Sequence, residues 1–137
     1  MPSENQETVN KGAYKAKSGQ TFFDIPSLTG LAAGPGYAET FGPVVEGEYI
    51  QCGVMRLPGG AVAADHTHPN EQWIYVLEGQ ITATIDGVSQ DAGPGQLIYI
   101  PPNAVHGTVV HSKDGVKFFT CKDLAGGGIA GKPVNAR

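Results

Sequence analysis

The sequence predicts an all-β domain, built as a barrel or a sandwich, and three observations favour this class. Short β-branched and aromatic runs recur about every ten residues, with Gly, Pro, Asn or Asp between them. Twenty glycines and ten prolines are spread among these runs without forming a repeat. No segment shows the periodicity of an amphipathic helix of any length. At 137 residues the chain is most simply one domain, and about two-thirds of its unfolded surface can be buried without disulfides.

The first third of the chain divides into a tail and a region rich in glycine and proline. Residues 1–10 are polar, and we expect a disordered or loosely attached tail. Residues 11–47 contain two β-prone segments, at 12–16 and 21–25, and a long loop over 26–43. Loops of this length are often functional or interfacial, so we expect this region to pack against the barrel or a second subunit.

The strands of the predicted barrel fall within residues 48–122. We expect strands or extended runs over 48–57, 61–65, 72–77, 80–85, 88–90, 97–100, 106–111 and 116–121. Asp86-Gly87 lies between two of them and is a strong hairpin signal, because a type I′ turn requires positive φ at both central residues. Residues 123–137 are expected to form a flexible tail or to lie over the surface.

Charge and hydropathy exclude several classes of function. The net charge of −4 offers no basic surface for nucleic acid or an anionic membrane. No apolar run reaches the roughly twenty residues of a membrane helix, and the N-terminus lacks the apolar segment of a secretory signal. We therefore expect a cytoplasmic protein with a small-molecule ligand. Cys52 and Cys121 match no zinc or redox spacing and are expected to be buried free thiols.

Two stretches contain three of the four histidines. A single residue, Thr67, separates His66 from His68. Both imidazoles therefore project from the same face of an extended strand and could form half of a metal site. His106 ends a second stretch, residues 95–106. His111 lies five residues further along and is expected to point outward.

The spacing within these stretches is specific. The first reads Gly60, five residues, His66-Thr67-His68, three residues, Gln72, six residues, Gly79; the second reads Gly95, five residues, Pro101-Pro102-Asn103, two residues, His106. This pattern, with fifteen residues between Gly79 and Gly95, resembles the two motifs of the cupins and covers residues 48–122. The resemblance implies a double-stranded β-helix of the jelly-roll class. It also implies a divalent transition metal bound by the three histidines and one further residue.

Two positions depart from the family pattern. Asn103 replaces a turn glycine, which is a mild change because Asn tolerates left-handed backbone. Gln72 stands where cupins usually have a glutamate ligand, and Glu71 is adjacent. Counting six residues back from Gly79 favours Gln72, as does the alternation of side chains along an extended chain. The turn at Pro69-Asn70 weakens the second argument, so Glu71 remains the alternative ligand.

The ligand set suggests the chemistry. Three neutral imidazoles and a neutral amide leave a divalent ion its full charge, which favours Lewis-acid catalysis on a small oxygenated substrate by a lyase or isomerase. The substrate would carry a carboxylate, a carbonyl or an enolisable group. Imidazole suits Mn, Fe, Ni, Zn and Cu, so the metal stays open. The alternatives are an iron- or copper-dependent dioxygenase and a non-catalytic small-molecule-binding cupin.

Three further residues are candidates for a catalytic role. Glu71 could act as a general base, and Arg56 could clamp a carboxylate if its side chain points inward. Tyr99 is the third candidate, although we expect Trp73 and Tyr99 mainly to pack in the core. The resemblance to cupins also implies a homodimer, in which additional strands at residues 12–25 pair across the interface.

Overall fold

The computed structural model describes residues 8–34, 36–126, 128 and 131–134. Two short 3-10 helices accompany the strands in this part of the chain, η2 (Ile25–Ser27) and η3 (Leu124–Gly126). The strands are β1 (Tyr14–Lys15), β2 (Leu31–Ala32), β3 (Phe41–Gly42), β4 (Val44–Glu46), β5 (Ile50–Leu57), β6 (Val62–Thr67), β7 (Gln72–Glu78), β8 (Ile81–Ile85), β9 (Val88–Ala92), β10 (Leu97–Ile100), β11 (His106–Val110), β12 (Val116–Asp123) and β13 (Lys132–Pro133).

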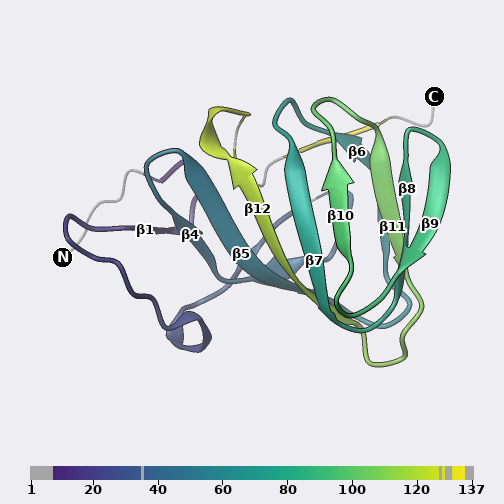
Figure 1. Cartoon of the computed structure of the whole chain (residues 1–137), viewed down its shortest axis with the longest axis horizontal. Coiled ribbons are helices and arrows are strands. Elements are labelled where there is room, and N and C mark those ends of the chain that lie inside the picture. The colour runs from purple at the N-terminus through teal and green to yellow at the C-terminus, as the bar shows by residue number, and fades with distance from the viewer. Residues whose placement is uncertain (1–7, 35, 127, 129–130, 135–137) are drawn as a thin grey trace.

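The strands form two sheets (Figure 1). The larger sheet has the order β1-β4-β5-β12-β7-β10, with β3 and β2 attached at β5, and the smaller has the order β13-β6-β11-β8-β9. Apart from the parallel pair β1 and β4, the described pairs run antiparallel. Two antiparallel sheets that share one core make a jelly roll, so the predicted all-β class is confirmed.

The core lies between the sheets and follows from the alternation of strand side chains. Every second residue of β7 and β12 is buried, because successive side chains point to opposite faces. The inward residues include Met55, Leu57, Ile74, Val76, Ile81, Val110, Val116 and Phe118. The outward set includes Trp73 and Tyr99, each 40% exposed, with ring centroids 4.5 Å apart. The expectation that these two rings pack in the core is therefore wrong.

The turns of the barrel follow the local sequence. Asp86 and Gly87 have φ of 49° and 84°, so both central residues of this hairpin have positive φ, as expected. Asn103 has φ of 65°, the left-handed conformation for which a glycine would be the usual choice. Its backbone N–H donates to the carbonyl of His68 at 2.9 Å, which joins the second motif to the first.

The N-terminal region differs from the sequence expectation in three places. Residues 1–7 of the expected tail lie outside the described part, but Val9 and Asn10 donate backbone N–H groups to the buried Glu46 carboxylate at 2.6 and 2.9 Å. Residues 21–25 form no strand and lead into η2. The loop over 26–43 contains the short strands β2 and β3.

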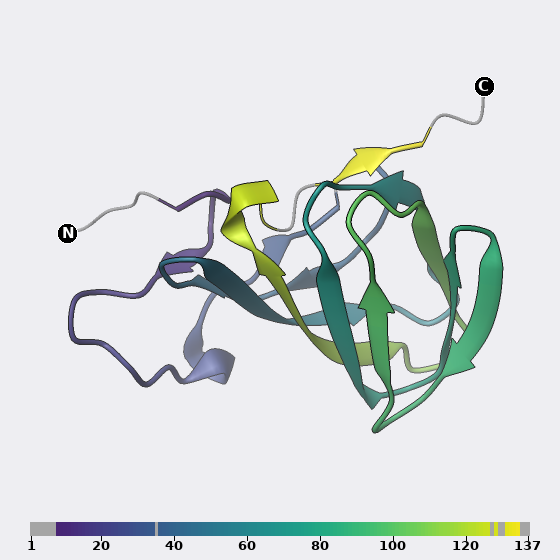
Figure 2. The same ribbon diagram turned by 45° about the horizontal axis from the view of Figure 1, so that its top comes forward.

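The C-terminal region also differs from expectation. Residues 132–133, expected in a flexible tail or over the surface, form β13, which pairs with His66 and Thr67 of β6. Figure 2 shows this yellow strand lying along β6. The chain end therefore extends the smaller sheet beside the first histidine motif.

Candidate metal centre

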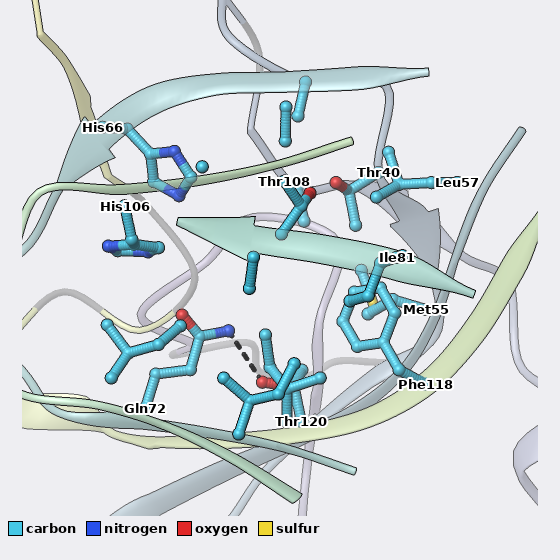
Figure 3. Close-up of a pocket in the computed structure, with 18 of the residues that line it drawn as sticks. Thr40, Met55, Leu57, His66, Gln72, Ile81, His106, Thr108, Phe118 and Thr120 are labelled. Carbon is cyan, nitrogen blue, oxygen red and sulfur yellow. Dashed lines mark hydrogen bonds between the residues drawn. The ribbon is translucent and has the colours of Figure 1, made fainter. Parts of the chain in front are cut away.

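The fold brings the three motif histidines together at one end of the barrel. His66 lies near the end of β6, His68 follows that strand, and His106 begins β11 directly opposite His66. All three side chains are buried, and their ligand nitrogens lie within 4.8 Å of one another. Figure 3 shows the rings of His66 and His106 one beside the other at the edge of a cavity.

Backbone carbonyls fix the tautomer of each imidazole. The three Nδ1 atoms contact carbonyl oxygens two residues away in sequence, at 2.7 Å for His66, 2.8 Å for His68 and 3.0 Å for His106. A carbonyl oxygen can only accept, so each Nδ1 carries the proton. Each Nε2 of the neutral ring therefore has a free lone pair, which is the form that binds a metal.

The amide of Gln72 is oriented by Thr120 on the neighbouring strand β12. The Thr120 hydroxyl donates to the carbonyl of Trp73 at 2.9 Å, so its oxygen accepts from Gln72 Nε2 at 2.8 Å. The amide oxygen of Gln72 then points toward the histidines, with Oε1 3.2 Å from His68 Nε2. Figure 3 shows the bond from Gln72 to Thr120.

These polar atoms fit a divalent transition-metal ion. His106 Nε2 is buried and has no hydrogen-bond partner among the described residues, an unfavourable arrangement unless something binds it. His68 Nε2 and Gln72 Oε1 face each other as two acceptors, so a hydrogen bond between them is not available in the neutral tautomer. A bound cation would accept the lone pairs of His106 Nε2, His68 Nε2 and Gln72 Oε1, so none of these atoms would be left without a partner. Imidazole nitrogen and amide oxygen are donors that such ions take.

Burial keeps the three imidazoles neutral. It lowers the pKa of His66 to about 4 and that of His106 to about 3, against hydrogen bonds to backbone carbonyls that raise them. The pKa of His68 is also lowered, first by burial and then by the charge of Lys122. All three rings are therefore unprotonated at neutral pH and free to act as ligands.

Lys122 is a residue of the candidate site that the sequence did not reveal. Its side chain is 7% exposed, it lies opposite Gln72 in the β7–β12 register, and burial lowers its pKa to about 8. The sequence placed the end of the last strand at Cys121. Because Phe118 and Phe119 are both apolar, alternation could not decide which face of that strand points inward.

A cavity of about 70 Å³ lies beside the histidines. Most of its polar side chains lie at the histidine end, namely His66, His106, Gln72, Thr120 and Lys122, whereas Thr40 and Thr108 lie beside Leu57 (Figure 3). The remaining walls are largely apolar and include Ala33, Met55, Leu57, Ala63, Ile74, Ile81, Ala83, Ile85, Ile98, Ile100, Val116 and Phe118. A polar end and apolar walls together suit a small amphipathic ligand.

Tyr37 also borders this cavity and stacks on His66, with ring centroids 4.0 Å apart and an interplanar angle of 23°. It belongs to the glycine- and proline-rich segment, and its carbonyl accepts the N–H of Ala64 on the approach to His66. No periodic pattern in that segment could have assigned Tyr37 to the site. Part of the expected surface loop is therefore a wall of the candidate centre.

The three other candidate residues lie away from the cavity. Arg56 is exposed on β5, and Glu71 is exposed before β7, where its carboxylate accepts a hydrogen bond from the Tyr99 hydroxyl at 2.7 Å. None of the three lines the cavity. The structure therefore places Arg56, Glu71 and Tyr99 outside the cavity, and the catalytic roles expected of them stay predictions that this geometry does not support. The buried Gln72, beside His68, is the better candidate ligand.

Two other expectations concern residues outside the centre. His111 is exposed, as expected, with Nε2 2.6 Å from the hydroxyl of Thr82. Cys52 and Cys121 are free and lie opposite each other on β5 and β12, but both are only partly buried. Burial raises the pKa of both thiols, which lowers their reactivity.

Comparisons with known proteins agree with this architecture. The model of the cupin domain family matches residues 53–121. The polyketide cyclase RemF from Streptomyces resistomycificus superposes with a TM-score of 0.72 over 85% of this chain and 87% of its own, at 20% identity. The oxalate decarboxylase of Bacillus subtilis gives a TM-score of 0.51 at 31% identity, over 56% of this chain and 21% of its own.

A sequence relative is the dimethylsulfoniopropionate lyase DddW of Ruegeria pomeroyi. It is 35% identical over 66 residues, which are 48% of this chain and 43% of the relative. The chain thus matches less than half the length of that enzyme. The family match, both motifs and the two-sheet barrel together show that this chain belongs to the cupins.

Over the described residues, no helix is long and apolar enough to cross a membrane.

Proposed function

We propose that this cupin binds one divalent transition-metal ion through His66, His68, Gln72 and His106, and that it is a lyase or isomerase of a small oxygenated substrate. The observation that carries the proposal is His106 Nε2, which is buried without a partner among the described residues and belongs to the cluster of ligand nitrogens. When bound, the metal supplies a Lewis acid that polarises a carboxylate, carbonyl or hydroxyl oxygen.

The neutral donor set supports non-redox chemistry. Three imidazoles and one amide carry no charge, and no Asp or Glu among the described residues lines the cavity. A carboxylate ligand is common in the iron sites of oxygenases, so its absence from these donors supports a lyase or isomerase more than a dioxygenase. The chain's part is to orient the donors through the backbone carbonyls and Thr120.

The walls of the cavity support catalysis by keeping water out. Apolar side chains form most of them, and Tyr37 covers one face of His66. Electrostatic interactions are stronger in such a site than in water, because the local dielectric is low. The partial matches to a lyase and to a decarboxylase support the same class of reaction.

The test uses His106→Ala with His111→Ala as the matched control, because His111 is exposed. Each full-length protein is stripped with a chelator, loaded in turn with Mn, Fe, Ni, Zn and Cu, and analysed for bound metal. We expect about one equivalent in the wild type and in the control, and little in His106→Ala. Loss of one of three or four ligands removes a large part of the affinity.

Activity is then measured on a panel of small carboxylates and enolisable carbonyl compounds, with oxygen uptake recorded in parallel. Metal-dependent turnover without oxygen uptake is the expected result. Full metal content in His106→Ala would contradict the metal site, and stoichiometric oxygen uptake by the iron-loaded protein would replace the lyase or isomerase assignment with a dioxygenase.

A further inference from the structure

Lys122 is a buried charge that the metal centre by itself does not require. Its side chain lines the cavity beside the histidines and exposes 7% of its surface. A buried ammonium is unfavourable unless an anion or several acceptors compensate it, so buried lysines ordinarily have a carboxylate beside them. In the part of the chain that the structure describes, no Asp or Glu lines the cavity, and burial lowers the pKa of Lys122.

The position of Lys122 adds to the uncompensated positive charge, because it lies close to the proposed metal ion. Lys122 lies opposite Gln72 in the sheet register, at the level of the proposed metal ligands. Its charge lowers the pKa of His66, His68 and His106, which places it within electrostatic reach of all three. The donors of the metal centre are neutral, so they compensate neither the metal nor the lysine. A bound anion at this end of the cavity would compensate both.

The cavity limits the size of that molecule. Its volume of about 70 Å³ is roughly half of the ~150 Å³ known to hold a benzene molecule, which gives space for about three non-hydrogen atoms. The walls beyond the polar end consist largely of aliphatic carbons from Leu57, Ile74, Ile81 and Ile100, together with Met55. An anionic head with a very short hydrocarbon part matches both ends of the cavity.

We propose that Lys122 binds the carboxylate of a very small aliphatic carboxylic acid, about the size of acetate, whose methyl group faces the apolar walls of the cavity. This inference rests on the proposed function, since the same acid would be the substrate class of the metal centre. The Nζ atom donates a charge-assisted hydrogen bond to a carboxylate oxygen. The proposal names the part of the substrate that Lys122 recognises and the size of molecule that the cavity accepts.

The experiment compares acetate with its uncharged analogue acetamide on the zinc-loaded full chain. Binding is measured by saturation-transfer NMR or calorimetry for the wild type, for Lys122→Met, and for Lys117→Met, which removes the same charge from the outer face of the same strand. We expect acetate to bind the wild type at least about tenfold more tightly than acetamide, as expected for a charged hydrogen bond. Lys122→Met should abolish this preference with an unchanged zinc content, and Lys117→Met should retain it.

The outcomes distinguish the inference about Lys122 from the proposed metal site. Equal affinity of acetate for wild type and Lys122→Met, or no preference for acetate over acetamide in the wild type, overturns the inference and leaves the metal proposal intact. If none of the five metals binds, the proposed function fails, and the same titration of the metal-free proteins still tests Lys122. The midpoint of thermal unfolding shows that Lys122→Met is folded, and Lys122→Gln provides a second uncharged variant should it not be.

Discussion

At the scale of single residues, the backbone orients the imidazoles of the candidate centre. Each Nδ1 donates to a carbonyl two residues away, so the position of the lone pair on Nε2 follows from the local chain path. Gln72 is set by a side chain instead, through the hydroxyl of Thr120. The orientation of each histidine side chain is therefore set by residues close to it in sequence, whereas the orientation of the Gln72 amide depends on the neighbouring strand β12.

The low pKa values of His66 and His106 predict a loss of stability in mild acid for the metal-free protein. Unfolded histidine titrates near pH 6.5, at about its ordinary pKa, but in the fold these two titrate at about 4 and about 3. Below pH 6.5 the unfolded chain binds more protons than the folded chain, so the free energy of unfolding falls as the pH falls toward 4. Above pH 6.5 these two histidines are unprotonated in both states, so they no longer lower the free energy of unfolding.

Urea unfolding of the metal-free protein at pH 7.5 and pH 5 measures this effect. The double variant His66→Gln, His106→Gln lacks both groups and should lose less stability between the two pH values than the wild type does. An equal loss in the two proteins would show that other groups cause the acid sensitivity.

Some residues of the site could be assigned from the sequence and others could not, for a physical reason. His66, His68 and His106 have the spacing from turn-forming glycines and prolines that resembles the two cupin motifs, and that resemblance predicted their meeting. Lys122 and Tyr37 reach the cavity through tertiary packing, which leaves no local pattern. Arg56 shows the converse, since a charged residue on a strand can point either way and this one points outward.

At the scale of elements, the longer β-branched and aromatic strands were predicted closely, and the very short strands were not. The bounds of β10 agree with the sequence expectation, and those of β7 differ by one residue. The two-residue strands β2, β3 and β13 exist because a neighbouring strand offers hydrogen bonds. Such pairing depends on distant parts of the chain, so composition alone gave a loop or a tail.

Gly79 ends the first motif and makes the turn that follows β7, close to the start of β12. Gly79 has φ of 92°, and a Cβ atom built there would overlap the carbonyl oxygen of Gly115. We expect Gly79→Ala to lower the free energy of unfolding by about 2 kcal/mol, from the left-handed backbone with the clash added. Chemical denaturation of the metal-free protein measures this.

Gly47→Ala serves as the control, because a Cβ there would be 3.5 Å from the nearest atom, the carbonyl oxygen of Ile50, and its φ lies outside the left-handed region. That change should alter the free energy of unfolding by no more than about 0.5 kcal/mol. A Gly79→Ala protein as stable as the control would refute the structural role given to this turn.

At the scale of the whole molecule, the barrel has a polar end for ligands and an apolar outer face. The outer face of the larger sheet exposes Trp73, Tyr75, Leu97, Tyr99 and Phe119. Contiguous apolar surface of this kind usually marks an interaction site. Strand β1 pairs with β4 of its own chain, and the dimer contact expected of residues 12–25 stays a prediction, as does the homodimer itself.

The central claim is that one metal ion is bound by four neutral donors at the end of the barrel. A crystal structure of the metal-loaded full chain, with anomalous scattering recorded at the absorption edge of the metal, tests it most directly. We predict one anomalous peak, about 2.0–2.3 Å from Nε2 of His66, His68 and His106 and from Oε1 of Gln72. A peak bound by Glu71 or by an Nδ1 atom, or no peak among these residues after loading, would contradict the claim.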